Sequence, residues 1–243
     1  MRTFRSSIFA SLGTAVVAMA LRAPAEGATD ITLATPDGVR IAVSFYQAAR
    51  SMGPAPAVIL LHMLTRSKAD WDEVAGQLAA AGIHALALDF RGHGNSGRPV
   101  TDEALDLGRL PLDVQTARSW LLTRTDVRAD RLGLAGASIG ANIAVLVASA
   151  DPAVRAIALL SPGVDYRGLR IDAALRKYGE RPALFVASHE DPYAGRSMRE
   201  LAAIGPGLRE TRLLSGAGHG TVMLTRDREL AGVLVDWFQK TLL

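Results

Sequence analysis

Short, continuous apolar runs alternate with amphipathic segments along most of this chain of 243 residues. The run PAVILLH, at residues 56–62, is typical of a strand that is buried on both faces of a sheet. Residues 70–81 follow it with apolar positions at helical spacing, and Asp70 with Glu73 predicts a capping box at the start of that helix. An alternation of buried strands and helices predicts a mostly parallel sheet with helices on both faces.

The same alternation continues to the end of the chain. Before it, a β-hairpin is expected, because alternating residues flank the turn sequence TPDG at residues 35–38. Further strands are expected at residues 83–90, 131–136, 154–162, 182–190 and 208–216, and further helices at 112–122, from about 138, at 171–178 and at 226–241. Residues 26–243 are therefore expected to form one α/β domain around about eight strands.

The first 25 residues have the composition of an export signal. Arg2 and Arg5 precede an apolar run at residues 8–21, and the Ala-Pro-Ala sequence at 23–25 suits cleavage by a signal peptidase. A helix of this run would span about 21 Å, less than the roughly 30 Å of a bilayer core, although an uncleaved anchor stays the alternative. We therefore expect a signal peptide over residues 1–25 and an exported protein, periplasmic or secreted, without stable membrane association.

Cleavage would start the mature chain at Glu26, or at Thr29 if the peptidase cuts three residues later. Removal of residues 1–25 takes away three of the 27 basic residues and none of the 24 acidic ones, so the remaining protein is formally neutral. This balance gives no reason to expect nucleic acid as a partner. The chain has no cysteine, which excludes a disulfide framework and a thiol nucleophile.

A serine interrupts the apolar stretch LGLAGASIGANIA at residues 132–144. Gly136, Ser138 and Gly140 fall where a strand is expected to end and a helix to begin. A sharp turn there would present the Ser138 hydroxyl above the sheet, and the helix N-terminus would direct free N–H groups at developing negative charge. The pattern indicates a nucleophilic serine, and the alternative is a tight turn without chemistry.

A nucleophilic serine needs a base, and the chain offers five histidines. His84 begins an expected strand and His189 ends one, which favours structural roles for both. His62 and His93 compete with His219 for the role of base. His219 is favoured because it lies in the glycine-rich segment SGAGHG after the last strand, where small neighbours let an imidazole reach inward.

The base needs a carboxylate that orients it. Asp191 follows the strand before the last one, and Pro192 stiffens the turn after it. A carboxylate at that strand end has the shorter reach to the His219 loop, which favours Asp191. Asp165, which follows an earlier strand, and Glu190, which precedes Asp191, stay as alternatives.

The order Ser138, Asp191, His219 is that of α/β-hydrolases. With LALDFRGHGNS, GASIGANIA, HEDPY and GAGHG in this order, the chain resembles the α/β-hydrolase superfamily, in its dienelactone-hydrolase-like and serine-esterase branch, over essentially all of the expected mature protein. The resemblance implies a serine hydrolase that cleaves an ester, thioester or lactone of a small soluble substrate through an acyl-enzyme, without cofactor or metal. A peptidase or acyltransferase on the same fold, or a non-catalytic binding protein, is the alternative.

The resemblance also implies an oxyanion hole made by the backbone N–H groups of Met63 and Ile139. Many members of the superfamily have glycine where this chain has Met63, after His62. A backbone N–H group needs no particular side chain, so the Met63 side chain is expected to line the acyl pocket, with packing in the core as the alternative. The segment Arg91-Gly92-His93-Gly94 is expected to form a structural turn and to bind neither metal nor phosphate.

Lids in the superfamily are commonly inserted between the helix after the nucleophile and the acid. Here residues 163–181 are all that is available, with one expected short helix. So short a segment cannot make a large apolar cover, which predicts a preference for acyl groups of roughly two to six carbons. The sequence leaves the oligomeric state open.

Overall fold

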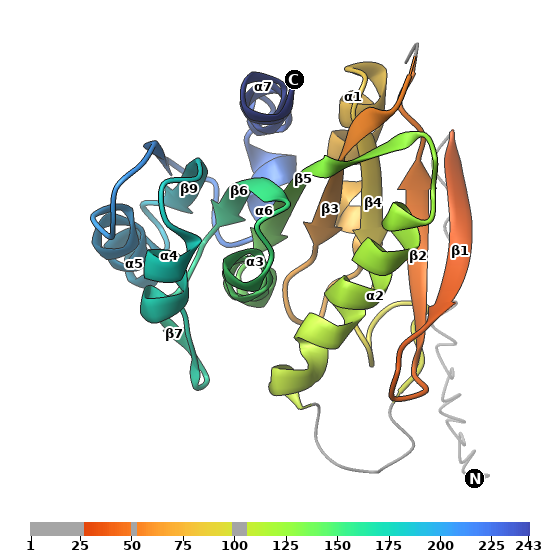
Figure 1. Ribbon diagram of the computed structural model, residues 1–243. Coiled ribbons are helices and arrows are strands. Elements are labelled where there is room, and N and C mark those ends of the chain that lie inside the picture. Colours follow the sequence, from red (N-terminus) through yellow and green to blue (C-terminus); the bar gives the residue numbers. More distant parts are fainter. Residues whose placement is uncertain (1–26, 50–52, 99–105) are drawn as a thin grey trace, which may run out of the picture.

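The apolar runs of the sequence form one central sheet (Figure 1). The structure, a computed structural model, describes residues 27–49, 53–98 and 106–243. The strands of the sheet are β1 (Ala28–Ala34), β2 (Arg40–Tyr46), β3 (Ala55–Leu61), β4 (His84–Leu88), β5 (Val127–Ala137), β6 (Val154–Leu160), β9 (Ala183–Ser188) and β10 (Arg209–Leu214). They lie in the order β1-β2-β4-β3-β5-β6-β9-β10, with β1–β2 and β2–β4 antiparallel and all other neighbours parallel. The prediction of a mostly parallel sheet of about eight strands is confirmed.

Helices cover both faces of this sheet. They are α1 (Asp72–Ala80), α2 (Leu110–Leu122), α3 (Ile139–Ala150), α4 (Asp172–Tyr178), α5 (Pro192–Ala202), α6 (Val222–Arg226) and α7 (Leu230–Leu242), with the 3-10 turns η1 (Lys68–Trp71) and η2 (Leu107–Arg109). Helices α2, α3, α4 and α5 pack on one face, and α1, α6 and α7 pack on the other (Figure 1).

Two apolar clusters, one on each face, hold these layers together. In β3, Ala57, Ile59 and Leu61 belong to the cluster under α2–α5, whereas Val58 and Leu60 belong to the cluster under α1 and α7. Successive side chains of a strand point to opposite faces, so a strand covered on both faces must be apolar at every position. The continuous run in the sequence therefore reflects helices on both sides.

The helix predicted over residues 70–81 starts later than expected. The 3-10 turn η1 precedes it, and no side chain caps the start of either η1 or α1. The carboxylate of Asp70 instead accepts two hydrogen bonds from the Arg66 guanidinium and one from the Thr221 hydroxyl. The capping-box prediction is wrong, because a partner far along the chain takes up the carboxylate that a local cap would use.

The C-terminal half differs from the prediction at two helices. No helix was expected after Asp191, yet α5 begins there and Asp191 caps it by accepting the Ala194 N–H group at 3.1 Å. An aspartate followed directly by proline is a helix-start signal that could have found α5. The helix predicted over residues 226–241 is two helices, because Asp227 ends α6 and its carboxylate accepts the Leu230 N–H group at the start of α7.

The parallel strands end at one edge of the sheet, where ligands bind in open α/β sheets. Leu61 at the end of β3 is in register with Gly136 of β5, and Ala137 is in register with Leu160 of β6. The segment between β6 and β9 is short, as predicted, and adds only α4 and a small hairpin of β7 (Asp165–Tyr166) and β8 (Leu169–Arg170). The loops that bear the predicted site residues follow β3, β5, β9 and β10 at this edge.

The export signal predicted over residues 1–25, and with it Glu26, lies outside the described residues. The alternative start, Thr29, lies inside β1, where Ala28 pairs with Tyr46. Within the part of the chain that the structure describes, no helix combines the length and the apolar character needed to cross a bilayer.

Candidate active site

Ser138 occupies the sharp turn between β5 and α3. Its φ of 54° and ψ of −117° are a conformation that a residue with a side chain rarely adopts, at a cost of about 1–3 kcal/mol. Glycines on both sides make the turn possible: a Cβ on Gly136 would lie 2.2 Å from the Gly140 carbonyl oxygen, and a Cβ on Gly140 would lie 2.4 Å from that of Leu61. The strained serine is held in place by backbone that only glycine allows to come so close.

Ser138 is buried at the start of α3. The residue is only 4% exposed, and its N–H group donates to the Leu160 carbonyl at 2.8 Å. Ile139 opens α3, so its N–H group has no acceptor within the helix. The positive end of the α3 dipole therefore lies at the serine, as the sequence predicted.

His219 and Asp191 meet across the end of the sheet. The distance from His219 Nδ1 to Asp191 Oδ2 is 2.5 Å, and the two side chains are 47% and 12% exposed. The other Asp191 oxygen accepts the Ala194 N–H group, so the helix cap fixes the orientation of the carboxylate. Asp165, the alternative acid, is exposed, and its carboxylate accepts the Gly168 N–H group within its own hairpin.

The loop with His219 and the turn at Ser138 are each bonded to a residue at the end of β6. The Gly220 N–H group donates to the Ser161 hydroxyl at 3.0 Å, and Ser161 directly follows Leu160, which accepts the Ser138 N–H group. Two successive residues at the end of β6 therefore hold both segments. Ser138 and His219 both lie in the described part of the chain, and no hydrogen bond joins their side chains; such bonds are often long before substrate binds.

Glu190 fixes the root of the same loop. Its carboxylate accepts the Ser188 hydroxyl and, at 2.9 Å, the Gly216 N–H group. These hydrogen bonds, first of all the one from Ser188, lower the pKa of Glu190 to about 2. Glu190 therefore anchors the loop, while Asp191 contacts the histidine.

His62 lies at the end of β3 and has both ring nitrogens engaged. Its Nδ1 lies 2.7 Å from the Met63 carbonyl oxygen, and its Nε2 lies 3.0 Å from the Phe90 N–H group. Because the N–H group can only donate, Nε2 is the acceptor and Nδ1 carries the proton. Burial lowers the pKa of His62 to about 4, so the ring is neutral at pH 7 and fixes the backbone after Met63.

The other histidines take no part in this arrangement. His93 lies beside His62, with ring centroids 5.2 Å apart. His84 is buried and contacts a backbone N–H group and a backbone carbonyl through its two nitrogens, which agrees with the predicted structural role. His189 is exposed at the end of β9.

Met63 lies between the end of β3 and the His219 loop. A Cβ on Gly220 would come within 2.4 Å of Met63 Sδ, so the thioether packs directly against the glycine next to His219. The cavity that opens beside this segment is lined by Leu64 and not by Met63. The Met63 side chain packs toward the α1 and α7 face, as the alternative of packing in the core expects. That Met63 lines the acyl pocket stays a prediction.

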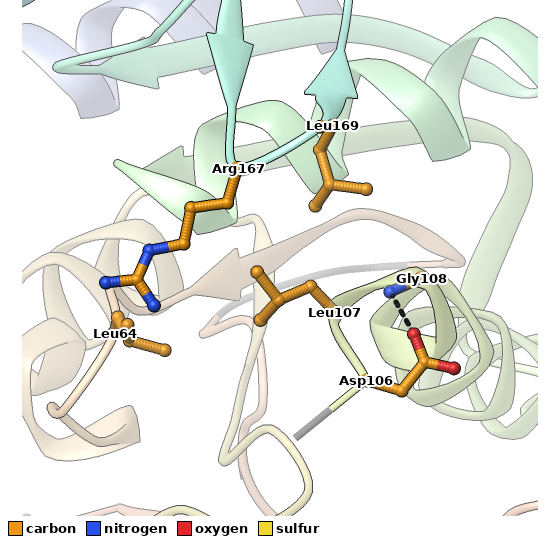
Figure 2. Close-up of a pocket in the computed structure, with 7 residues that line it drawn as sticks. Leu64, Asp106, Leu107, Gly108, Arg167 and Leu169 are labelled. Carbon is orange, nitrogen blue, oxygen red and sulfur yellow. Dashed lines mark hydrogen bonds between the residues drawn. The ribbon is translucent and has the colours of Figure 1, made fainter. Parts of the chain in front are cut away.

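Figure 2 shows this cavity, which has a volume of about 590 Å³. Its walls come from three separate segments: Leu64 after β3, residues 106–108 before α2, and residues 167–169 in the β7–β8 hairpin. Leu107 and Leu169 point toward one another across it, and the Arg167 guanidinium lies over Leu64 (Figure 2). The cavity therefore has apolar walls with one cationic residue, Arg167, and one acidic residue, Asp106.

Side chains from two helices hold the hairpin side of the cavity. The Asn142 amide, one turn along α3 from Ser138, donates to the Gly163 and Leu169 carbonyls at 2.9 and 3.0 Å. The Gly163 N–H group donates back to the Asn142 oxygen at 3.1 Å. From the other side, the Tyr193 hydroxyl donates to the Asp165 carbonyl at 2.5 Å. The hairpin is thus tied both to the helix after Ser138 and to the helix after Asp191.

The segment from Arg91 to Gly94 forms a structural turn that starts from the buried Arg91 side chain. Arg91 makes ion pairs with Asp113 and Asp37, both at 2.7 Å, and these partners raise the pKa of the guanidinium against the effect of burial. A Cβ on Gly94 would collide with the Asp89 carboxylate. Among the described residues, no group of three or more His, Cys, Asp or Glu is placed to hold a metal ion.

Comparison with known proteins places this geometry among hydrolases. The family described as serine aminopeptidase, S33, matches residues 53–203. A probable 2-oxo-3-(5-oxofuran-2-ylidene)propanoate lactonase of Bradyrhizobium is 34% identical over 112 residues, 42% of this chain and 44% of that protein. An uncharacterized protein of Mycobacterium tuberculosis is 33% identical over 134 residues, 55% of this chain and 45% of its own. The chain thus matches less than half the length of these curated relatives.

Two solved structures show the same fold. A dienelactone hydrolase of Anabaena variabilis superimposes with a TM-score of 0.71 at 18% identity, over 90% of this chain and 100% of that one. An esterase of Pyrococcus furiosus superimposes with a TM-score of 0.69 at 18% identity, over 89% and 93% of the two chains. At these identities the likeness shows the α/β-hydrolase fold alone.

Proposed function

Because this chain belongs to the serine aminopeptidase (S33) family of α/β-hydrolases, we propose that it is a serine hydrolase that cleaves carboxylic esters of small substrates. The observation that carries the proposal is the 2.5 Å hydrogen bond between His219 Nδ1 and Asp191 Oδ2. The loop that bears His219 is bonded to Ser161, the residue after the one that accepts the Ser138 N–H group. A nucleophile, a base and an orienting carboxylate in this chain order are the requirements of acyl transfer through a triad.

The reaction follows from the roles of the three side chains. His219 takes the proton of the Ser138 hydroxyl through Nε2, and Ser138 Oγ attacks the ester carbonyl to give a tetrahedral intermediate. His219 then gives the proton to the leaving alcohol, and an acyl-enzyme forms. Water attacks the acyl-enzyme by the same route and regenerates Ser138. Asp191 holds the tautomer with the proton on Nδ1 and stabilises the imidazolium.

The N–H groups of Met63 and Ile139 are the proposed donors to the oxyanion. The close approach of Gly140 to the Leu61 carbonyl brings the start of α3 against the backbone that leads into Met63. Neutral His62 holds the Met63 carbonyl and so fixes the backbone at this donor. Two fixed N–H groups at a helix N-terminus stabilise the charge that develops on the carbonyl oxygen.

An ester, thioester or lactone of a small molecule is the proposed substrate, and the mechanism uses no cofactor or metal. The names of the similar proteins, an esterase, a dienelactone hydrolase and a lactonase, support this class. We assign the acyl group to the cavity beside Leu64, because its apolar walls adjoin the proposed oxyanion segment. The basic start, apolar run and Ala-Pro-Ala sequence of residues 1–25 support export.

A fluorophosphonate probe, followed by p-nitrophenyl esters and aminoacyl p-nitroanilides, tests the proposal. We expect covalent labelling at Ser138 and turnover of the esters well above that of the anilides. Faster turnover of the anilides would make the protein an aminopeptidase, as the family description suggests. Transfer of the acyl group to an added alcohol in preference to water would make it an acyltransferase, and absence of labelling would favour a binding protein.

A further inference from the structure

Two segments on either side of the site are joined by a hydrogen-bonded network that the mechanism above does not use. Arg66 donates to both carboxylate oxygens of Asp70, at 2.8 and 2.7 Å. The Thr221 hydroxyl donates to the Asp70 oxygen that also receives the Arg66 Nε–H group. Asp70 and Thr221 are 151 positions apart in the sequence, so this contact links the segment after Met63 to the loop that bears His219.

Burial makes this link expensive to break. Thr221 is 1% exposed and the Asp70 side chain is 12% exposed, whereas Arg66 reaches solvent. A buried hydroxyl or carboxylate that loses its partner keeps the full cost of its desolvation. The Arg66 guanidinium balances the charge, and its hydrogen bonds to Asp70 raise the pKa of Arg66. The network is therefore complete, with each polar group paired.

Through Thr221, the network is connected to the loop that bears His219. Only Gly220 separates the two residues, and its N–H group is held by Ser161 on one side while Met63 Sδ packs against it on the other. His219 itself is attached to Asp191, from the α5 side of the loop. The Asp70–Thr221 bond fixes the same loop from the opposite side, where the proposed oxyanion donor Met63 lies.

We propose that Asp70 is a positioning residue which, through Thr221, holds the His219 loop at a fixed place relative to the oxyanion segment. The inference rests on the proposed function, since it concerns the alignment of the base with the donors. The physical basis is that the rate of acid–base catalysis depends steeply on the position of the base. Asp70 does not cap η1 or α1, so its carboxylate has no local structural role at these helix starts.

Thr221→Val is the sharpest test, because it removes the hydroxyl with almost no change in shape. We expect kcat for a p-nitrophenyl ester and the rate of fluorophosphonate labelling to fall about tenfold or more, with KM within about twofold. Thr221→Ser, which keeps the hydroxyl, should restore both to within about twofold of the wild type. Thr116→Val is the matched control, since that hydroxyl donates to the Leu112 carbonyl within α2.

A double-mutant cycle with Asp70→Ala tests whether the two residues act through one bond. We expect the double variant to be no slower than the slower single variant, because the second change removes nothing further. Asp151→Ala is the matched control. The Asp151 carboxylate also binds an arginine through both oxygens, but it lies at the end of α3. This variant should keep kcat within about twofold of the wild type. If Asp70→Ala does not fold, the comparison of valine and serine at position 221 decides alone.

Three results would overturn the inference while leaving the proposed function intact. They are a Thr221→Val enzyme within twofold of the wild type, a Thr221→Ser enzyme as slow as Thr221→Val, and losses that multiply in the double variant. A wild-type protein that the fluorophosphonate does not label would instead remove the proposed function, and this inference with it.

Discussion

His219 and Asp191 lie 28 positions apart in the sequence, yet their Nδ1 and Oδ2 atoms are 2.5 Å apart. The carboxylate is held by the start of α5 and the imidazole by a loop with contacts on both sides. Each partner is thus fixed by a different element, which is the arrangement that an orienting hydrogen bond requires.

Ser138→Ala should abolish labelling by a fluorophosphonate and lower kcat by a factor on the order of 10⁶, since a triad acts as a unit. The strained turn should relax little, because the same glycines enclose alanine at this position. Intact-mass analysis after labelling, with ester turnover, measures both effects. Ser161→Ala, at the next strand end, should still be labelled; retention of most esterase activity by Ser138→Ala would refute the nucleophile assignment.

Asp191→Asn should lower kcat by up to roughly 10⁴, because the amide favours the wrong tautomer of His219. Asp165→Asn is the matched change in the alternative acid, and it should cost far less, since the Asp165 carboxylate accepts an N–H group of its own hairpin. Steady-state kinetics with one p-nitrophenyl ester compares the two variants. The opposite ranking would show that Asp165 orients the base.

Ester specificity should reflect the small cavity beside Leu64. We expect kcat/KM to be highest for acyl groups of roughly two to six carbons, with about 1 kcal/mol lost for each poorly placed methylene. Leu107→Ala should move the optimum toward longer chains, whereas Leu213→Ala, at an exposed position of β10, should not. A series of p-nitrophenyl esters from acetate to palmitate measures this. An optimum at decanoate or longer, or a jump in rate above the critical micelle concentration, would indicate a lipase.

The stability of the fold should fall in mild acid because of His62. Its pKa is about 4 in the folded protein and about 6.5 when unfolded, so the unfolded chain takes up a proton first. The neutral ring is fully favourable above pH 6.5, and its contribution should decline as the pH falls to about 4, by about 3 kcal/mol in all. Urea unfolding at several pH values measures the decline, which His62→Gln should reduce and His189→Gln should not. If the free energy of unfolding declines equally with falling pH in the wild type and in His62→Gln, His62 is not the cause of the decline.

The mature chain should begin at Glu26. Cleavage there would leave β1 whole, whereas a start at Thr29 would remove the Ala28–Tyr46 pair at the end of the first hairpin. Intact-mass measurement of the protein from the cell envelope distinguishes the two ends. Retention of residues 1–21 would show that the segment is an anchor.

Local sequence patterns were sufficient to predict the fold class and the sharp turn at Ser138. Apolar periodicity and the Gly136-x-Ser138-x-Gly140 spacing depend only on residues that are close in the sequence. Such residues are also close in space, whatever the tertiary structure. The parallel order of the strands then brings the ends of β3, β5 and β9 to one edge, so the Asp191–His219 pairing could be expected from connectivity.

Which partners the side chains at that edge bind depends on contacts between segments that are far apart in the sequence. Asp70 matches the local pattern of a helix cap, but its carboxylate binds Thr221, 151 positions away. The Met63 side chain packs against Gly220, and the next residue, Leu64, lines the cavity. Local sequence carries no information on which loops are in contact. A buried polar group binds the partner that is available in the folded protein, because an unpaired buried group costs more free energy than the loss of a helix cap.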